Sequence, residues 1–236
     1  MKKQLIYFLL GFSILSFNSC KKSDDVTPSS NSGSKEHYMP LTVGNTWTYN
    51  SASKGEYTNT ITGTKSINNK AYFILTNSAS TAATGYMRYD GNKLYSSSTV
   101  QGKDIELLML DEDATEGKSW LAGIIPMTMT GYYSYNVKYT CTLVQNLKSY
   151  TVNGKTYSDI KVLNFKTTIE NFELGTVYTS MYSGEELETV KTELFGTFQA
   201  TTVNQTQYYS KGIGFVYQDS EEVSSLGTNL LSYTIK

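Results

Sequence analysis

The chain is poor in the residues from which most metal and catalytic sites are built. Its 236 residues include one histidine, His37, and two cysteines, Cys20 and Cys141. One histidine excludes a two-histidine zinc site or a facial triad, and two cysteines cannot form a disulfide framework. Serine–histidine catalysis is also excluded, because the sequence has no Gly-x-Ser-x-Gly turn and His37 lies in or beside a polar segment. We therefore predict that the protein is not an enzyme and has no catalytic residues, no cofactor and no metal site.

Charged residues are scarce as well, and neither sign dominates. There are 20 basic and 21 acidic residues, giving a net charge of -1, and Arg88 is the single arginine. Nucleic-acid-binding proteins need a basic patch that this composition does not supply. With 39% apolar residues the chain is too hydrophobic to be disordered. The composition indicates a globular protein that does not bind nucleic acid.

The first twenty residues have the order of a secretion signal. Lys2 and Lys3 precede an apolar run from Leu5 to Leu15, and the small Ser19 precedes Cys20. About 11 apolar residues form a helix too short to cross the ~30 Å hydrocarbon core of a bilayer. A cysteine directly after such a run can carry lipid on its thiol, so Cys20 is the predicted lipid anchor.

Composition divides the chain into three parts. We predict a lipoprotein signal peptide at 1–19, the lipidated cysteine with a flexible tether at 20–37, and a β domain at 38–236. The tether is predicted because its residues are mostly Ser, Asn, Gly, Pro or charged, with little to bury. A flexible tether of ~16 residues places the domain roughly 20–24 Å from its anchor.

Residues 38–236 show the period of two that is typical of half-buried strands. From Tyr133 to Leu143 the odd positions are apolar or aromatic and the even positions are polar. No segment of the mature chain offers a convincing amphipathic helix of three turns. The pattern predicts an all-β fold: a long, curved antiparallel meander that closes into a barrel-like or half-barrel shape, or alternatively a sandwich. Turn-forming pairs separate the strands: Asn68-Asn69, Asp90-Gly91, Asn153-Gly154 and Lys211-Gly212.

Three short motifs recur in the same order. The pairs are GNTW at 44–47 with GKSW at 117–120, INNKAY at 67–72 with VNGKTY at 152–157, and, more weakly, YMRYDGNKLY at 86–95 with YYSKGIGFVY at 208–217. Because the motifs occur in the same order twice, we predict an internal repeat with copies at 38–113 and 114–236. The copies would form two related β lobes that share one sheet or pack side by side.

Some of these motifs resemble those of known lipoproteins. Ser19-Cys20 followed by KKSDD at 21–25 is similar to the start of many Bacteroidota lipoproteins, in which a basic and then acidic run is associated with export to the cell surface. PLTVGNTWTY at 40–49 and YYSKGIGFV at 208–216 resemble the opening and closing motifs of a set of uncharacterised Bacteroidota lipoproteins. The resemblance implies an all-β outer-membrane lipoprotein, on the cell surface or the periplasmic face, with no established activity.

Other residues that could carry chemistry have a stronger structural interpretation. Cys141 falls on the apolar side of a predicted strand, where a thiol is inert packing. The two Ser-x-x-Lys matches, Ser32–Lys35 and Ser51–Lys54, lie in the tether and in a polar turn rather than on a helix. Acidic runs occur at 111–116 and 185–188. The first offers ligands for calcium but lacks the spacing of an EF-hand, so we predict a solvated loop.

Aromatic residues are the remaining signal, with 20 tyrosines among them. Trp47 and Trp120 are expected to fill the core. Tyr208 and Tyr209 are adjacent in a predicted strand, as are Tyr132 and Tyr133, so one of each pair must face away from the core. Outward tyrosines either form cross-strand pairs or stack on sugar rings.

We therefore predict a lipid-anchored, non-enzymatic envelope protein that reaches the membrane through acylated Cys20. Its β domain would bind or scaffold a ligand or partner outside the membrane. One alternative is a carrier of a hydrophobic ligand, which needs an apolar interior that side chains do not fill. Another is a glycan-binding accessory of a surface polysaccharide system, which needs exposed coplanar rings. A glycosidase, the third alternative, needs two carboxylates across a cleft.

Overall fold

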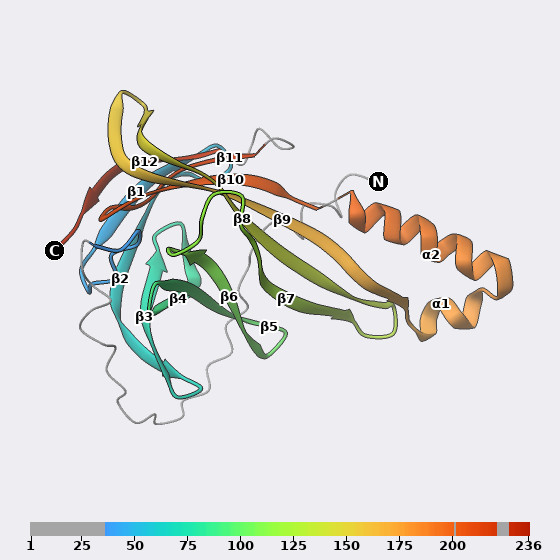
Figure 1. The fold of residues 1–236 in the computed structure, drawn as a ribbon. Coiled ribbons are helices and arrows are strands. Elements are labelled where there is room, and N and C mark those ends of the chain that lie inside the picture. Colours follow the sequence, from blue (N-terminus) through green and yellow to red (C-terminus); the bar gives the residue numbers. More distant parts are fainter. Residues whose placement is uncertain (1–35, 201, 221–226) are drawn as a thin grey trace.

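A computed structural model describes residues 36–200, 202–220 and 227–236, which form twelve strands and two helices (Figure 1). The predicted signal peptide, Cys20 and most of the tether lie outside these residues. The helices are α1 (Thr176–Met181) and α2 (Gly184–Gln199). The strands are β1 (Thr46–Ser51), β2 (Gly55–Ile67), β3 (Lys70–Asn77), β4 (Ser80–Asp90), β5 (Lys93–Val100), β6 (Lys103–Asp111), β7 (Ser119–Met129), β8 (Tyr133–Val152), β9 (Lys155–Leu174), β10 (Asn204–Ser210), β11 (Gly214–Ser220) and β12 (Thr228–Thr234).

All twelve strands belong to one antiparallel sheet. The strand order is β6-β5-β4-β3-β2-β1-β12-β11-β10-β9-β8-β7. Strands that follow each other in sequence are therefore neighbours, except β6 and β7, which form the two edges, and β1 pairs with β12. The sheet curls until its two edge strands, β6 and β7, approach each other. This confirms the predicted barrel-like meander. A sandwich would have divided the strands between two facing sheets.

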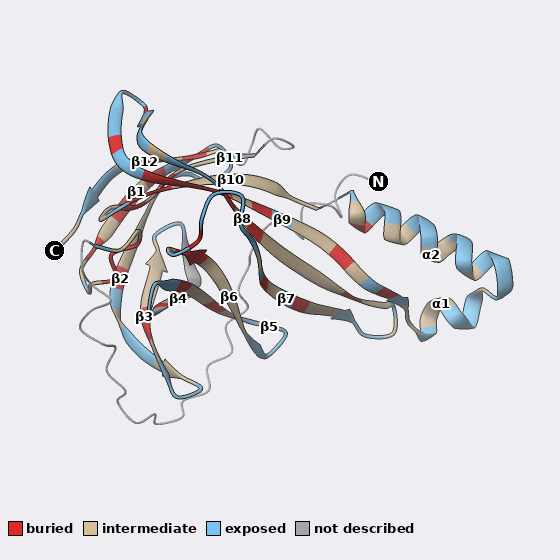
Figure 2. Cartoon of the chain, viewed as in Figure 1, coloured by how far each residue is buried: buried red, intermediate tan, exposed pale blue. Residues whose placement is uncertain are grey.

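Alternation along the strands places one face of the sheet in the interior. In β8, Tyr135, Cys141 and Leu143 are buried, as the odd-position pattern predicted. Trp47 is fully buried and Trp120 packs against the same core, so both tryptophans have the expected role. Buried residues follow the barrel strands, whereas most of the surface of α2 is exposed (Figure 2).

The predicted turns form at the predicted pairs. Asn68 and Asn69 have φ of 50° and 61°, and Asn153 and Gly154 have φ of 50° and 75°. Two successive positive φ angles define the turn whose twist matches that of a β-hairpin, and Asn and Gly adopt it at low cost. These pairs therefore set the register of the β2–β3 and β8–β9 hairpins.

Side chains, rather than backbone pairing, close the barrel between β6 and β7. The Trp120 indole N–H of β7 donates to the Leu108 carbonyl of β6 (3.1 Å). The amide of Gln101, in the turn before β6, donates to the Thr128 carbonyl (2.8 Å) and accepts from the Thr128 N–H (3.1 Å). Pro126, which lacks an N–H, lies within β7, as is typical of an edge strand. We call this side-chain junction the seam.

The seam depends on the absence of a side chain at Gly123 of β7. A Cβ there would overlap the Leu107 Cδ2 atom of β6 and lie 3.2 Å from the Glu106 carbonyl oxygen. We expect Gly123→Ala to lower the free energy of unfolding by about 1–2 kcal/mol through overpacking. In a double-mutant cycle measured by urea unfolding, Leu107→Ala should relieve part of that loss. Strictly additive effects would show that the two strands do not meet there.

The recurring motifs occupy corresponding places in the two halves of the sheet. Trp47 lies in β1 and Trp120 in β7, the first strands of the two predicted copies. The second motif pair forms the β2–β3 and β8–β9 turns, and the third forms the β4–β5 and β10–β11 turns. Each predicted copy thus contains six consecutive strands, and the boundary at 113/114 falls between β6 and β7.

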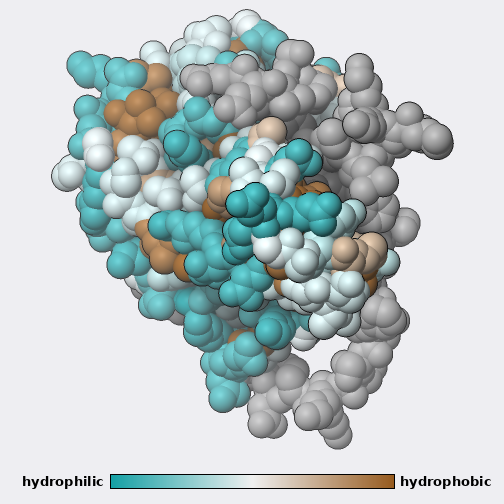
Figure 3. Space-filling model, turned by 90° about the vertical axis from the view of Figure 1, so that its right-hand side faces the viewer, coloured by the Kyte–Doolittle hydropathy of each residue, from teal (hydrophilic) through white to brown (hydrophobic). Residues whose placement is uncertain are grey.

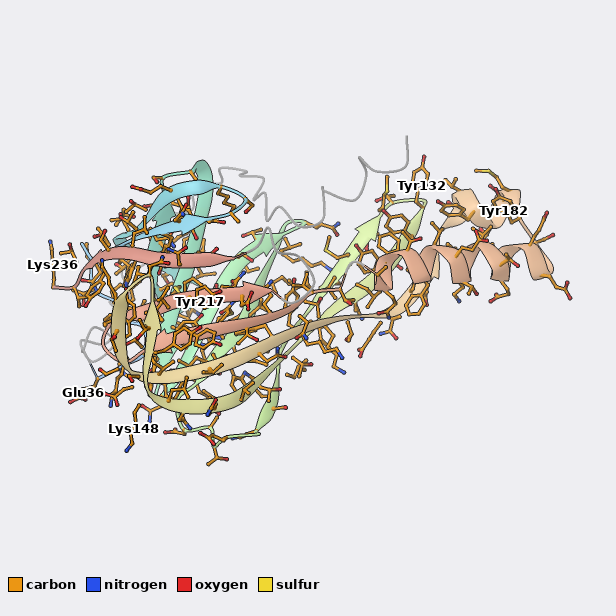
Figure 4. All side chains as sticks on the ribbon, turned by 90° about the horizontal axis from the view of Figure 1, so that it is seen from above. Glu36, Tyr132, Lys148, Tyr182, Tyr217 and Lys236 are labelled. Carbon is orange, nitrogen blue, oxygen red and sulfur yellow. The ribbon has the colours of Figure 1, made fainter. Side chains whose placement is uncertain are left out.

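The first described residues and the helices lie at opposite ends of the molecule. Glu36, Lys148 and Lys236 are at one end, which we call the anchor end, and Tyr132 and Tyr182 are at the other (Figure 4). β7, β8 and β9 extend past the other strands toward this second end, where the β7–β8 turn lies and α1 and α2 continue from β9 (Figure 1). We call residues 176–199, which contain α1 and α2, the arm.

The arm corrects the prediction that the mature chain has no amphipathic helix of three turns. α2 spans 16 residues and turns Leu194, Phe195 and Phe198 toward the sheet. Within the described part of the chain, neither helix has the length and apolar content needed to span a membrane.

Candidate functional site

One carboxylate fastens the first described residues to the anchor end. Glu112, in the β6–β7 loop, accepts hydrogen bonds from the Tyr38 backbone N–H (2.8 Å) and the Tyr89 hydroxyl (2.8 Å). His37 Nδ1 lies 3.1 Å from its other oxygen, and the His37 ring stacks on Tyr89 at 4.1 Å. The Gly212 N–H donates to the His37 carbonyl (2.8 Å). His37 is therefore part of the fold, and the point at which the tether leaves the barrel is fixed.

The other acids of the 111–116 run are engaged as well. The predicted solvated loop is wrong for Asp111, which is buried, and for Glu112. The reason is that these carboxylates accept hydrogen bonds from backbone N–H groups of other segments, those of Tyr38 and of Asn146 in β8. No group of three or more potential metal ligands occurs among residues 36–200, 202–220 and 227–236. The remaining contacts are Asp111 with Lys118 (3.6 Å), Asp113 with the Asn92 side chain (2.9 Å) and Glu116 with the Asn146 N–H (2.6 Å).

A second polar cluster links four adjacent strands on the face away from the core. Glu106 of β6 accepts hydrogen bonds at Oε1 from Arg88 Nε (2.7 Å) and the Tyr72 hydroxyl (2.5 Å), and at Oε2 from Lys70 Nζ (2.7 Å). The Arg88 guanidinium lies 4.4 Å from the centre of the Tyr95 ring, within range of a cation–π contact. Arg88, the single arginine, is only 8% exposed. We call these five residues the Arg88 cluster.

The electrostatics of the Arg88 cluster are those of an ion-pair network. Partial burial acts to raise the pKa of Glu106, but hydrogen bonds from Arg88, Lys70 and Tyr72 outweigh it and lower the pKa to about 2. Burial and the bond to Glu106 raise the pKa of Tyr72 to about 12. Both groups therefore keep one protonation state near pH 7, and the cluster ties edge strand β6 to β3, β4 and β5.

The lowered pKa predicts a loss of stability in acid. The folded pKa of Glu106 lies below its ordinary value near 4.5, so its contribution is complete above about pH 5 and is lost as the pH falls toward 2. Solvent screening of this partly exposed group limits the contribution to about 1–2 kcal/mol. In urea unfolding, the difference between the native chain and Glu106→Gln should shrink over this window. A difference that stays constant from pH 7 to pH 2.5 would contradict the assignment.

The outward tyrosines of β8, β10 and β11 pack on one another. Tyr150 stacks on Tyr208 with ring centres 4.3 Å apart and an interplanar angle of 17°, and Tyr217 lies 5.5 Å from Tyr208. Tyr209 is buried, which confirms that Tyr208 and Tyr209 point to opposite faces. These three rings hold the bent β8–β9 hairpin against the sheet. Their mutual stacking covers the ring faces that a sugar would need.

The centre of the barrel is a packed core. Trp47, Tyr49 and Tyr209 are buried there, and Phe215 lies 5.5 Å from Tyr49 and 5.7 Å from Tyr209. The Trp47 indole N–H donates to the Ile213 carbonyl (2.6 Å). A carrier of the predicted kind would need open space at this position.

The arm is attached to the barrel by close backbone contacts. The Gly175 N–H donates to the Tyr132 carbonyl (2.5 Å), and the Val177 N–H donates to the Gly131 carbonyl (2.8 Å). A Cβ at Gly175 would lie 2.5 Å from the Gly131 carbonyl carbon and oxygen. Only glycine permits this approach, which fixes α1 to the β7–β8 turn.

An aromatic cluster supports the C-terminal half of α2. Phe198 packs on Tyr133 and Tyr135 of β8, with ring centres 5.0 and 4.9 Å apart, and on Phe172 of β9 at 5.5 Å. Leu194 and Phe195 add to the same cluster, which is separate from the core of the barrel. The C-terminal half of α2 is therefore held against the sheet, while the first turns of α2 project beyond it (Figure 1).

An apolar strip lies where the β7–β8 turn meets α1. Met129 ends β7 and is 48% exposed, Tyr132 is 41% exposed and Met181 is 62% exposed. The half-buried Tyr178 links Tyr132 to Met181, because its ring lies 6.3 Å from that of Tyr132 and it is three residues before Met181, on the same side of α1. Met129 is joined to Tyr132 by a backbone hydrogen bond across the turn, from the Tyr132 N–H to the Met129 carbonyl (2.9 Å). We call these four residues the strip. Tyrosine and methionine are enriched in the cores of protein–protein interfaces.

The remaining predicted residues have structural roles or lie outside the described chain. Cys141 is fully buried, and burial raises the pKa of its thiol, so it is the inert core residue that was predicted. Ser51–Lys54 lies at the end of β1 and in the turn before β2, where no helix forms. Ser32–Lys35 falls outside the described residues. The acids at 185–188 lie at the exposed start of α2.

Comparison with known proteins identifies no family. No family model and no curated protein matches the chain. A protein from Parabacteroides distasonis ATCC 8503, described as a "putative lipoprotein", matches with a TM-score of 0.43 and 11% identity over 84% of this chain and 99% of that chain. A likeness at this level says nothing about what the chain does.

Proposed function

We propose that this chain is a non-enzymatic, lipid-anchored envelope protein that binds a partner protein outside the membrane through its arm. The observation that carries the proposal is the opposite placement of Glu36 and the arm (Figure 4). A chain tethered through Cys20 leaves the barrel beside Glu36, and the exposed strip lies at the other end.

The attachment of both ends supports the proposal. The contacts of Glu112 fix the anchor end, and Gly175 fixes the arm to the β7–β8 turn. A flexible tether of ~16 residues adds reach of roughly 20–24 Å and lets the barrel turn. It still joins the barrel at the anchor end, so the arm is the part farthest from the point of attachment. The barrel then acts as a rigid spacer between lipid and partner.

The proposal omits catalysis because the two half-buried carboxylates already pair within the fold. Glu106 is bonded to three donors and Glu112 to His37, Tyr38 and Tyr89. Neither the packed barrel centre nor the stacked tyrosines favour the carrier or the glycan-binding alternative over a protein partner.

Cysteine labelling in native envelopes tests the proposal. Met181→Cys introduces a thiol on the strip, and Lys148→Cys introduces one at the exposed anchor end. The native thiol of Cys141 is buried and does not compete. We expect a maleimide to label both variants when the full chain is purified in detergent, and to label position 181 at least fivefold more slowly in envelopes.

Two controls make this experiment decisive. Equal labelling of both positions in envelopes would contradict a partner on the arm. The variant Cys20→Ser should release the chain from the membrane fraction, and its retention there would contradict the lipid anchor.

A further inference from the structure

The strip has the chemistry of a surface that binds another protein. Its four members come from β7, the β7–β8 turn and α1, and the contact between Tyr132 and Tyr178 joins them. Backbone hydrogen bonds at Gly131 and Gly175 hold these segments in one arrangement, so little ordering cost remains on binding. Viewed from the arm end, hydrophobic side chains show between hydrophilic ones on the described surface (Figure 3).

The arm that carries part of this apolar strip is negatively charged. The arm contains Glu185, Glu186, Glu188 and Glu193 against a single Lys191, a net charge of -3. Outside the arm, the chain from Cys20 onward has as many basic as acidic residues, because Lys2 and Lys3 belong to the predicted signal peptide. Glu185 and Glu186 follow Met181 closely and are exposed at the start of α2. The arm is thus the acidic part of an otherwise neutral mature chain.

The charge decides between possible occupants of the strip. A second copy would place one arm of charge -3 against another, and an anionic lipid surface would also repel it. A cationic surface gains from the same field, which speeds encounter and disfavours wrong partners. Apolar contact at the centre with charge pairs at the rim is the usual arrangement of a protein interface.

We propose that the arm binds a protein surface on which an apolar ridge is flanked by lysine or arginine side chains. This inference rests on the proposed function, because it assigns the class of partner to the same surface. Binding is driven by the strip, and its selectivity comes from the glutamates.

A defined peptide pair tests this inference on the full chain in neutral detergent. The probe is a synthetic helical peptide with leucines at i, i+3, i+4 and i+7 and lysines at the remaining positions. Its control has glutamate in place of every lysine. Titration calorimetry should detect the lysine peptide only, with affinity that falls as salt is raised from 50 to 500 mM.

Amino-acid substitutions test whether the lysine peptide binds to the arm. Glu185→Gln with Glu186→Gln should weaken binding of the lysine peptide about tenfold at low salt. The matched pair Glu56→Gln with Asp104→Asn removes two exposed charges from the barrel and should change it less than twofold. Met181→Asp should weaken it by at least tenfold, and circular dichroism would verify that α2 persists in each variant.

Each contrary result has a separate meaning. Equal effects of the arm and barrel pairs, binding of the glutamate peptide, binding to anionic vesicles, or self-association through the arm would overturn the basic-partner inference. If Met181→Cys is still protected in envelopes, the proposed function survives that failure. If position 181 is unprotected, the proposed function fails whatever the peptides do.

Discussion

Replacing Arg88 by methionine should lower the free energy of unfolding by about 2–3 kcal/mol. Methionine keeps most of the length of the side chain but removes the guanidinium that bonds to Glu106 and packs on the ring of Tyr95. Arg88 is 8% exposed, and its removal costs both this buried packing and the ion pair, leaving Glu106 with Lys70 and Tyr72 as its partners. Urea unfolding followed by tryptophan fluorescence measures the change.

Lys138 provides a matched control for this substitution. Its Nζ lies 2.9 Å from Glu170, but both side chains are more than a third exposed. Lys138→Met should therefore cost less than about 0.5 kcal/mol. If the two substitutions cost the same, burial does not strengthen the Arg88 cluster, and the edge strand β6 must be held in another way.

Replacing Gly175 by alanine should detach the arm from the barrel. The new Cβ would meet the backbone of Gly131, which cannot rotate away as a side chain can. We expect a local cost of about 1–3 kcal/mol, seen as faster hydrogen exchange over residues 176–199. Exchange in β1 and β12, which lie in the middle of the sheet, should stay unchanged.

Gly196→Ala makes the same chemical change elsewhere in the arm. No atom lies within 4 Å of a Cβ at Gly196, which is within α2. Alanine should stabilise the helix there by up to about 1 kcal/mol and slow exchange. Faster exchange in both variants would show that the arm tolerates no added methyl group, rather than that Gly175 is its point of attachment.

The strands were predictable because their pattern is local. The alternation from Tyr133 to Leu143 fixes which side of β8 faces the core, and Asn153-Gly154 fixes where the hairpin turns. A period of two specifies half-buried strands whatever their neighbours, so the all-β meander could be read from sequence. Which strands form the edges could not, since that depends on the pairing of β1 with β12.

The helix α2 was missed although its signal is present. Leu187, Val190, Leu194 and Phe198 lie on one side at helical spacing, and Ser183-x-x-Glu186 has the form of a helix start. The stretch is also rich in threonine, a poor helix former. In the structure, the hydroxyls of Thr189, Thr192 and Thr197 bond to carbonyls one turn earlier, which satisfies them without stabilising the helix. Packing of its C-terminal half on the sheet stabilises α2 instead.

The polar clusters could not be predicted from the sequence for a different reason. His37 and Glu112 are 75 residues apart, and Arg88 and Glu106 are 18 apart on strands joined through β5. No local pattern marks such pairs, and the acids at 111–116 look like a solvated loop until the barrel closes around them. The exposed strip depends in the same way on α1 packing beside the β7–β8 turn.

Photo-crosslinking in native envelopes tests the central claim most directly, namely that the end opposite the anchor is the end that binds. A benzophenone amino acid would replace Met181 on the strip or Lys148 at the anchor end. We predict that illumination joins position 181, but not position 148, to one protein of discrete mass. Adducts from position 148 alone, or only lipid adducts from position 181, would contradict the account.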